Sequence, residues 1–202
     1  MNRLEIRLAG TGGQGLILAA RMLADALVAQ GRQVAQSQTY EPTSRGGYCN
    51  ADLVAAPGAV DYPLATSLDA LVLLDRLAVA PSWPLLRPGA LVLADTRLCP
   101  DLPEGDCQAL HLPMTRTAID LGSERVANIV ALGALSALAG LCERAALERA
   151  VRAETPRNFV ELNQDALAAG FRLALTHDGA DFSSRRLGPA APAARTTDRH
   201  SA

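Results

Sequence analysis

The residues best suited to chemistry lie near the start of the chain, in a turn rich in glycine. Residues 10–15 read GTGGQG, and this GxGxxG pattern is typical of phosphate-binding turns when it follows a strand and opens a helix. Gly12 and Gly13 would let backbone amides approach an anion, because neither residue carries a Cβ atom. The following helix would add free N–H groups and the positive end of its dipole. The motif predicts a site for a phosphate or pyrophosphate, although the same glycines would also suit a tight turn that binds nothing.

A nicotinamide dinucleotide needs a further residue that this chain lacks. Its ribose hydroxyls are usually held by an acidic residue at the end of the next strand, about 20 residues on. The chain has Gln36, Ser37 and Gln38 there, and Glu41 lies further along beside Pro42. The missing acid argues against NAD and favours a different ligand that carries phosphate.

A second polar loop, YEPTSRGG at residues 40–47, follows the second predicted strand. In a parallel sheet this loop would emerge at the same carboxyl edge as the glycine turn, so both loops could face one ligand. Arg45 offers a planar fork of donors suited to phosphate, and Ser44 with the amide of Gly46 could complete a polar cradle. A solvated turn with a surface arginine would have the same composition, so both interpretations stay open.

Several other residues that could do chemistry also have a purely structural explanation. Asn128 lies in an otherwise apolar helix, where a buried amide needs either a ligand contact or an internal bond from helix to loop. His111 has no Ser, Cys or Asp arranged around it for a catalytic triad, and Trp83 is expected to anchor a turn. The cysteines form no CxxC pair and have no histidine at metal-ligand spacing, so we expect small buried hydrophobes and no metal site; they are Cys49, Cys99, Cys107 and Cys142.

The hydropathy pattern alternates between strands and helices along most of the chain. Apolar runs predict strands at 3–9, 33–37, 50–55, 70–74, 90–94 and 107–112. Helical spacing predicts helices at 14–30, 76–86, 124–141, 143–154 and 157–176, the 124–141 helix being rich in small residues, and a long loop is expected at 38–48. Strands that alternate with helices predict a Rossmann-like doubly wound α/β domain with a mostly parallel sheet and a helical C-terminal part. We expect this domain to cover residues 1–177 and residues 178–202 to form a disordered tail.

The composition excludes several classes of protein. Hydrophobic residues make up 49% of the 202 residues and charged residues 20%, which is enough for a packed core. Aromatic residues make up only 3% and the formal net charge is -2, so we expect no binding to nucleic acid. No apolar run is long enough to span a membrane and the first residues predict a strand, so we expect a cytoplasmic protein without an export signal.

Several segments together resemble the gamma subunit of the 2-oxoacid:ferredoxin (acceptor) oxidoreductases. The resemblance extends from Leu4 to Ala174, and GxGGQG followed by SRGG at this separation is much rarer than GxGxxG alone. Glu41 departs from the pattern, because many relatives have a glycine after the tyrosine. The matching segments are GTGGQG, QSQTYEPTSRGG, DALVLLD, RPGALVLAD, ANIVALGAL and NFVELNQDALAAGF.

The resemblance implies a multisubunit enzyme that oxidatively decarboxylates a 2-oxoacid to its acyl-CoA and passes electrons to ferredoxin or another acceptor. It implies that thiamine diphosphate with Mg sits on alpha and beta subunits and that iron–sulfur clusters sit on partner subunits. This chain would carry no catalytic residue and would help to bind coenzyme A. The residues implied or expected to contact coenzyme A are Gly10, Thr11, Gly12, Gly13, Gln14, Ser44, Arg45, Gly46 and Asn128.

Two other functions compete with that expectation. A free-standing Rossmann-type dinucleotide-binding oxidoreductase is the alternative from another class, and it is disfavoured by the missing ribose acid and by the lack of an acid–base pair near either loop. A purely structural subunit with an empty glycine turn is the third possibility. The family acts on several 2-oxoacids, and nothing in this sequence selects one of them.

Overall fold

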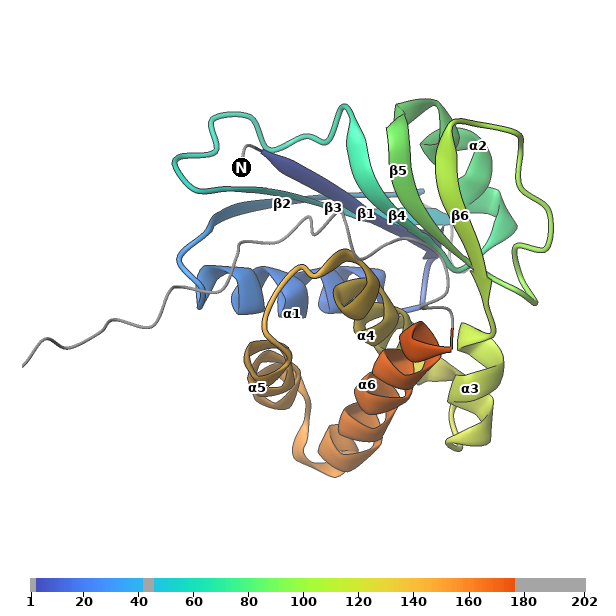
Figure 1. The fold of residues 1–202 in the computed structure, drawn as a ribbon. Helices are drawn as coiled ribbons and strands as arrows, with labels where there is room; N and C mark the ends of the chain where they lie inside the picture. The colour runs from blue at the N-terminus through green and yellow to red at the C-terminus, as the bar shows by residue number, and fades with distance from the viewer. Residues whose placement is uncertain (1–2, 42–45, 177–202) are drawn as a thin grey trace, which may run out of the picture.

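The computed structural model describes residues 3–41 and 46–176. Six strands form one sheet in the order β2-β3-β1-β4-β5-β6 (Figure 1). The strands are β1 (Leu4–Thr11), β2 (Gln33–Tyr40), β3 (Tyr48–Ala56), β4 (Leu68–Leu73), β5 (Leu86–Asp95) and β6 (Cys107–Leu112). The α-helices are α1 (Leu16–Val28), α2 (Val79–Ser82), α3 (Met114–Asp120), α4 (Ala127–Ala139), α5 (Arg144–Glu154) and α6 (Val160–Leu175). The predicted α/β fold with a mostly parallel sheet and a helical C-terminal part is confirmed.

Strand β3 is the exception to the parallel arrangement. It runs antiparallel to both of its neighbours, β2 and β1, while β1, β4, β5 and β6 pair in parallel. The predicted long loop at residues 38–48 is therefore partly wrong, because β2 continues to Tyr40 and β3 begins at Tyr48. The end of β2 was not predicted because its residues are polar, and an edge strand that is only half-buried needs no continuous apolar run.

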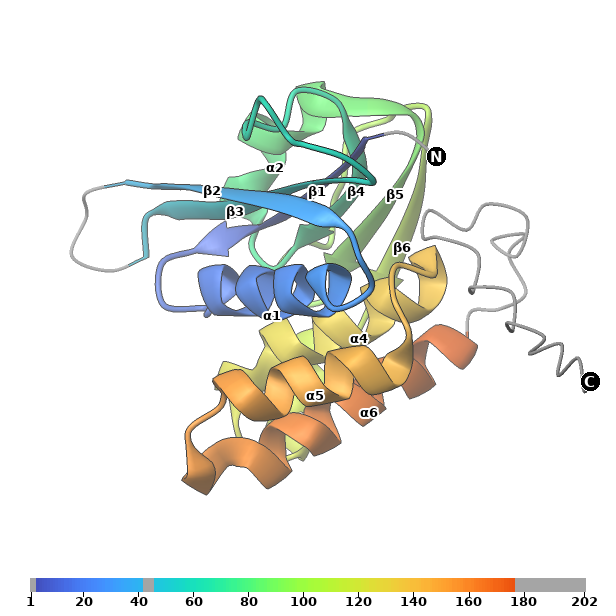
Figure 2. The ribbon, with the colours of Figure 1, turned by 90° about the vertical axis from the view of Figure 1, so that its left-hand side faces the viewer.

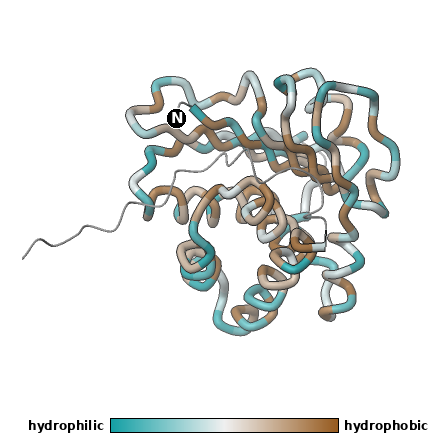
Figure 3. The backbone as a smooth tube through the Cα atoms, in the orientation of Figure 1, coloured by the Kyte–Doolittle hydropathy of each residue, from teal (hydrophilic) through white to brown (hydrophobic). Residues whose placement is uncertain are grey.

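Helices cover both faces of the sheet. Figure 2 shows α1, α4, α5 and α6 on one face and α2 on the opposite face. The larger apolar core lies under α1 and α4 and includes Leu23, Leu53 and Leu132, and Figure 3 shows hydrophobic residues running along the central strands. A smaller core on the α2 face is closed by Trp83. The Trp83 Nε1–H donates to the carbonyl oxygen of Glu104 at 3.3 Å, which confirms its role as an anchor.

The crossover between β4 and β5 differs from the predicted helix at 76–86. It consists of the 3₁₀ turn η1 (Arg76–Ala78), the short helix α2 and the 3₁₀ turn η2 (Trp83–Leu85), because Pro81 and Pro84 lack the N–H groups that one continuous helix needs. Residues 87–89 lie within β5, where Gly89 has φ +73 and the register with β4 shifts. Helix α3 was not predicted from the sequence.

Helices α4 and α6 cross at two glycines. A Cβ atom on Gly133 would lie 2.4 Å from the carbonyl oxygen of Leu167, and one on Gly170 would lie 2.0 Å from that of Val130. Both distances are far below a van der Waals contact, so only glycine fits at either position. The small residues noted in the predicted 124–141 helix thus allow α4 to pack closely against α6.

Charged side chains are buried on the α2 face of the sheet. Arg7 on β1 donates Nε and Nη2 to the two carboxylate oxygens of Asp52 on β3, at 2.7 and 2.8 Å, and its Nη1 donates to the carbonyl oxygen of Pro81 at 3.3 Å. Asn50 donates Nδ2 to the same carboxylate at 2.9 Å. A buried ion pair is tolerated when its remaining groups are hydrogen-bonded, so this cluster joins β1, β3 and α2.

The predicted limits of the domain and the tail cannot be compared with the structure, because residues 177–202 lie outside the described residues. No helix in residues 3–41 and 46–176 is long and apolar enough to cross a membrane. The same residues contain no cluster of three or more His, Cys, Asp or Glu side chains suited to a metal ion.

Candidate functional site

The glycine turn and the second loop lie side by side at the carboxyl end of β1. The Gly12 amide donates to the carbonyl oxygen of Gly47 at 2.9 Å, which confirms that the two loops share one edge of the sheet. Gly46 is exposed and has φ +78. Ser44 and Arg45 lie outside the described residues, so their contacts stay predictions.

The four glycines of the turn have different roles. A Cβ on Gly10 would lie 2.1 Å from the Gln14 Oε1, and one on Gly15, whose φ is +71, would lie 2.5 Å from the Asn128 Nδ2. Gly13 has φ +99 and open space around it. Gly12 has no positive φ, and the nearest atom to its Cβ position is 3.9 Å away. Gly10 and Gly15 are therefore needed by the fold, whereas Gly12 leaves open space that a ligand can use.

Gln14 braces the turn with both ends of its side-chain amide. Its Oε1 accepts from the Thr11 amide at 2.8 Å, and its Nε2 donates to the carbonyl oxygen of Leu74 at 2.9 Å. The Leu74 amide bonds in turn to the carbonyl oxygen of Ala9 at 2.9 Å. The turn is thereby fixed to the end of β4, and the structure gives Gln14 a positioning role that the motif alone did not reveal.

Asn128 fastens the start of α4 to the start of α1. Its side chain is buried, its Nδ2 donates to the carbonyl oxygen of Gly15 at 2.9 Å, and its Oδ1 accepts from the Ile129 amide at 2.9 Å. Of the two alternatives left open by the sequence, the structure shows the internal bond from helix to loop. No side chain among the described residues caps α1, so the first amides of this helix are available to an anion.

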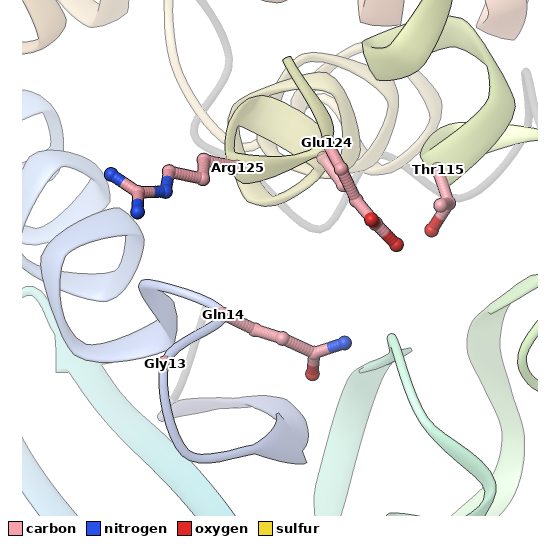
Figure 4. A pocket seen from close by; sticks show the side chains of 6 residues that line it. Gly13, Gln14, Thr115, Glu124 and Arg125 are labelled. Carbon is pink, nitrogen blue, oxygen red and sulfur yellow. The ribbon is translucent and has the colours of Figure 1, made fainter. Parts of the chain in front are cut away.

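A pocket of about 210 Å³ opens beside the turn. Figure 4 shows Glu124 and Thr115 on the far side from Gln14, and Arg125 extending toward α1. The lining residues are Gly13, Gln14, Thr115, Glu124, Arg125 and Ala127. The sequence analysis did not identify Thr115, Glu124 and Arg125. They follow the last strand, β6, and belong to no motif, and only the fold brings them next to the glycine turn.

Asp95, at the end of β5, organises the far wall of this pocket. Its fully buried carboxylate accepts from the backbone amide of Thr115 at 2.6 Å and from the amides of Arg97 and Leu98 at 3.0 and 3.1 Å. Three amide donors compensate the loss of water around the buried carboxylate. Asp95 therefore fixes the start of α3 next to the candidate site.

The cysteines are unsuited to nucleophilic chemistry. Burial raises the pKa of Cys99 to about 12, with Asp75 and Asp95 adding to the shift, and burial raises the pKa of Cys142 to about 11. Such thiols stay protonated at neutral pH, and the thiolate is the reactive form. All four cysteines are free; Cys49 and Cys99 are buried as expected, whereas Cys107 and Cys142 are only partly buried.

Comparison with known proteins identifies the family. The family model described as pyruvate ferredoxin/flavodoxin oxidoreductase matches residues 5–173. The chain belongs to this family. Among curated members of the pyruvate ferredoxin/flavodoxin oxidoreductase family, the 2-oxoglutarate synthase subunit KorC of Methanocaldococcus jannaschii is 34% identical over 85% of this chain and 94% of its own length. The ketoisovalerate oxidoreductase subunit VorA of Methanothermobacter marburgensis is 29% identical over 67% of this chain and 28% of its own length.

Solved structures of the pyruvate ferredoxin/flavodoxin oxidoreductase family have the same fold. The gamma subunit of a keto/oxoacid ferredoxin oxidoreductase from Geobacter sulfurreducens matches with a TM-score of 0.80 and 42% identity, over 87% of this chain and 98% of its own. The 2-oxoglutarate:ferredoxin oxidoreductase of Magnetococcus marinus, solved with 2-oxoglutarate, coenzyme A and succinyl-CoA bound, matches with a TM-score of 0.77 and 26% identity, over 87% of this chain and 32% of its own. The resemblance to a gamma subunit is confirmed, and the chain is a subunit of an oxidoreductase of this family.

Proposed function

We propose that this chain is the gamma subunit of a thiamine-diphosphate-dependent 2-oxoacid:acceptor oxidoreductase and that its glycine turn binds coenzyme A. Partner alpha and beta subunits hold thiamine diphosphate with Mg, which supplies the decarboxylation chemistry when bound. An iron–sulfur subunit passes the electrons to ferredoxin or another acceptor. This chain contributes binding and assembly rather than a catalytic group.

The observation that carries the proposal is the open space over Gly12 beside the uncapped start of α1. The Gly12 amide donates to the carbonyl oxygen of Gly47 at 2.9 Å, which fixes the turn. No side chain among the described residues caps the first amides of α1. Backbone amides at a helix start bind phosphate and pyrophosphate, and coenzyme A carries a pyrophosphate. The bound coenzyme A in the Magnetococcus marinus relative supports this choice of ligand.

The residues of this chain perform three tasks toward that ligand. The Gly12 amide already donates to Gly47, so the amides of Gly13 and of the uncapped first turn of α1 bind the pyrophosphate. Gln14 keeps the turn fixed to β4 through its two hydrogen bonds. Asn128 holds the first carbonyl of α1 in place from α4. Ser44 and Arg45 of the second loop, which lie outside the described residues, are proposed as further contacts to the phosphates. Binding in this place orients coenzyme A toward the partner subunits.

The dinucleotide-binding alternative is disfavoured by the position of β3. In a dinucleotide-binding Rossmann fold the second parallel strand lies next to the first and carries the acid for the ribose. Here β3 lies between β1 and β2, with Asn50 opposite Ala9 and Thr39 opposite Asn50. The strand that would carry the ribose acid is displaced by one position in the sheet, and it has no acid at Gln36, Ser37 or Gln38.

Gly12→Val tests the proposal in the assembled complex. The added side chain meets no protein atom closer than 3.9 Å at its Cβ position, but it fills the space assigned to the ligand. We expect the KM for coenzyme A to rise about tenfold or more, as for the loss of a hydrogen bond to a charged group. Decarboxylation of the 2-oxoacid in the absence of coenzyme A, followed by reduction of a dye, should stay unchanged.

Gly58→Val is the matched control, because Gly58 also has no positive φ and no neighbour within 4 Å. An unchanged KM for Gly12→Val, with the complex intact on size-exclusion chromatography, would show that the turn does not bind coenzyme A. Tight binding of NAD or NADP to the isolated chain would instead favour the free-standing oxidoreductase.

A further inference from the structure

An arginine without a charged partner lines the pocket beside the glycine turn. Arg125 is exposed, contributes to the 210 Å³ pocket together with Gly13 and Gln14, and forms no ion pair or side-chain hydrogen bond with another described residue. Other arginines near this edge are already paired: Arg116 with Asp120 at 3.0 Å and Arg97 with Glu124 at 3.8 Å. The Arg125 guanidinium is therefore free to take an anion.

The backbone that carries Arg125 is held in place relative to the turn. Arg125 lies in the 3₁₀ turn η3 (Glu124–Val126), which leads directly into α4. Asn128, three residues later, is bonded to the carbonyl oxygen of Gly15 at 2.9 Å. This bond joins the start of α4 to the glycine turn, so the fold sets the position of the Arg125 backbone beside the turn.

The charge at this pocket favours an anion on the α1 side. In Figure 4 the Arg125 guanidinium extends toward α1, while the Glu124 carboxylate points the other way, across the pocket from Gln14. Among the described residues that line this pocket, Glu124 is the one acidic side chain, and Arg97 offsets part of its charge. The positive end of α1 and the guanidinium thus act on the same region.

We propose that Arg125 binds the pyrophosphate of coenzyme A together with the amides of the glycine turn. This inference rests on the proposed function, and it adds a residue that neither loop motif contains. A guanidinium presents several N–H donors in a plane and matches phosphate oxygens in pairs. The pocket is smaller than the roughly 300–1,000 Å³ of a site that takes a whole drug-sized ligand, so it accepts one part of coenzyme A.

The test is a calorimetric titration of the assembled complex with coenzyme A in the absence of any 2-oxoacid, so that no reaction takes place. Arg125→Gln should raise the Kd about tenfold or more, because a charge-assisted contact is lost. Arg125→Lys should recover part of the affinity, since the charge returns without the planar fork. Arg149→Gln removes one exposed positive charge from α5 and should leave the Kd unchanged.

A second titration uses dephospho-coenzyme A, which has the pyrophosphate but lacks the 3′-phosphate. Arg125→Gln should weaken its binding by the same factor, because the contact proposed is with the pyrophosphate. A loss of affinity seen only with complete coenzyme A would overturn this assignment and move Arg125 to the 3′-phosphate.

The variants separate this inference from the proposed function. An unchanged Kd for Arg125→Gln, beside a raised Kd for Gly12→Val, overturns the role of Arg125 and keeps the turn as the coenzyme A site. Unchanged affinity in both variants refutes the proposed coenzyme A site at the turn as well. Since Arg125 is exposed, its replacement should leave complex assembly intact, and size-exclusion chromatography of each variant verifies this.

Discussion

Gly10 and Gln14 act as one unit at the residue scale. The Cβ that any other residue would add at position 10 falls 2.1 Å from the Gln14 Oε1, at the place where this oxygen accepts the Thr11 amide. A longer side chain at position 10 therefore displaces Gln14 and leaves the Thr11 amide and the Leu74 carbonyl without their partner. Buried polar groups that lose a partner carry a larger free-energy cost than the bond itself contributes.

Gly10→Ala should lower the free energy of unfolding by about 1–3 kcal/mol, the cost of polar groups left without partners. Urea denaturation measures this change, with Gly58→Ala as a control in open space. Gln14→Ala should have a similar effect. Because both replacements break the same bonds, the double variant should be less destabilised than the sum of the two. Additive effects would show that Gly10 and Gln14 act independently.

Asn128 shows where prediction from the sequence stops at this scale. A buried amide in an apolar helix needs a hydrogen-bond partner, and that much follows from the residue type. The partner, the carbonyl oxygen of Gly15, is 113 residues away in the chain, so local pattern could not choose it over a ligand. Nothing in the sequence favoured Arg125 as a ligand contact, because an exposed arginine before a helix is common. The residues that line its pocket are brought together only by the fold.

At the scale of elements, the crossing of α4 and α6 sets the shape of the helical layer. Gly133 and Gly170 each lie against the backbone of the opposite helix, and a backbone cannot yield as a flexible side chain does. The start of α4 carries Arg125 and Asn128 toward the glycine turn, so a change in the α4–α6 distance also shifts the wall of the pocket.

Gly170→Ala should therefore destabilise the protein by about 1–3 kcal/mol or more, the usual cost of an overpacked core. The added Cβ would lie 2.0 Å from the carbonyl oxygen of Val130, so the helices must separate. Urea denaturation with Gly58→Ala as the reference measures the effect. A stability equal to or above that of the unchanged protein would show that the helices can separate without loss, contrary to the packing described.

The elements themselves were predictable to different degrees. Residues 70–73 of β4 and 90–94 of β5 are buried on both faces and read as continuous apolar runs, whereas β2 is a polar edge strand and was predicted too short. Helix α3 has seven residues and no side-chain cap within the described residues, so it lacked both the length and the boundary signals by which helices are recognised. The antiparallel direction of β3 depends on strand pairing, which periodicity does not encode.

For the molecule as a whole, charged groups gather at the amino edge of the sheet, opposite the candidate site. The Glu5 carboxylate accepts from the amides of Thr66 and Ser67 at 2.5 and 2.8 Å and pairs with Arg3 at 2.6 Å. Burial raises the pKa of Glu5, but the amide bonds and Arg3 outweigh burial, and the pKa lies below its ordinary value of 4.5. This carboxylate joins β1 to the segment that precedes β4.

The lowered pKa of Glu5 gives an acid dependence of stability with a definite sign. Because the pKa is lower in the folded than in the unfolded chain, the stabilisation is complete above about pH 4.5 and is lost as the pH falls through the folded pKa. Urea denaturation at a series of pH values should show this loss, and Glu5→Gln should reduce the slope below pH 4.5. An identical pH profile for the variant would show that Glu5 is not the group responsible.

The position of β3 determines the order in which the candidate site is completed during synthesis. Residues 4–56 contain β1, α1, β2 and β3, and the β1–β3 and β2–β3 pairings are both made within that segment. N-terminal parts of a chain emerge from the ribosome first, so the pairings that bring the two loops together can form before β4 has emerged. Arg125 and Asn128 are synthesised more than a hundred residues later than the turn, to which Asn128 is hydrogen-bonded. A nascent chain thus carries the glycine turn early but gains the opposite wall of its pocket only when α4 docks.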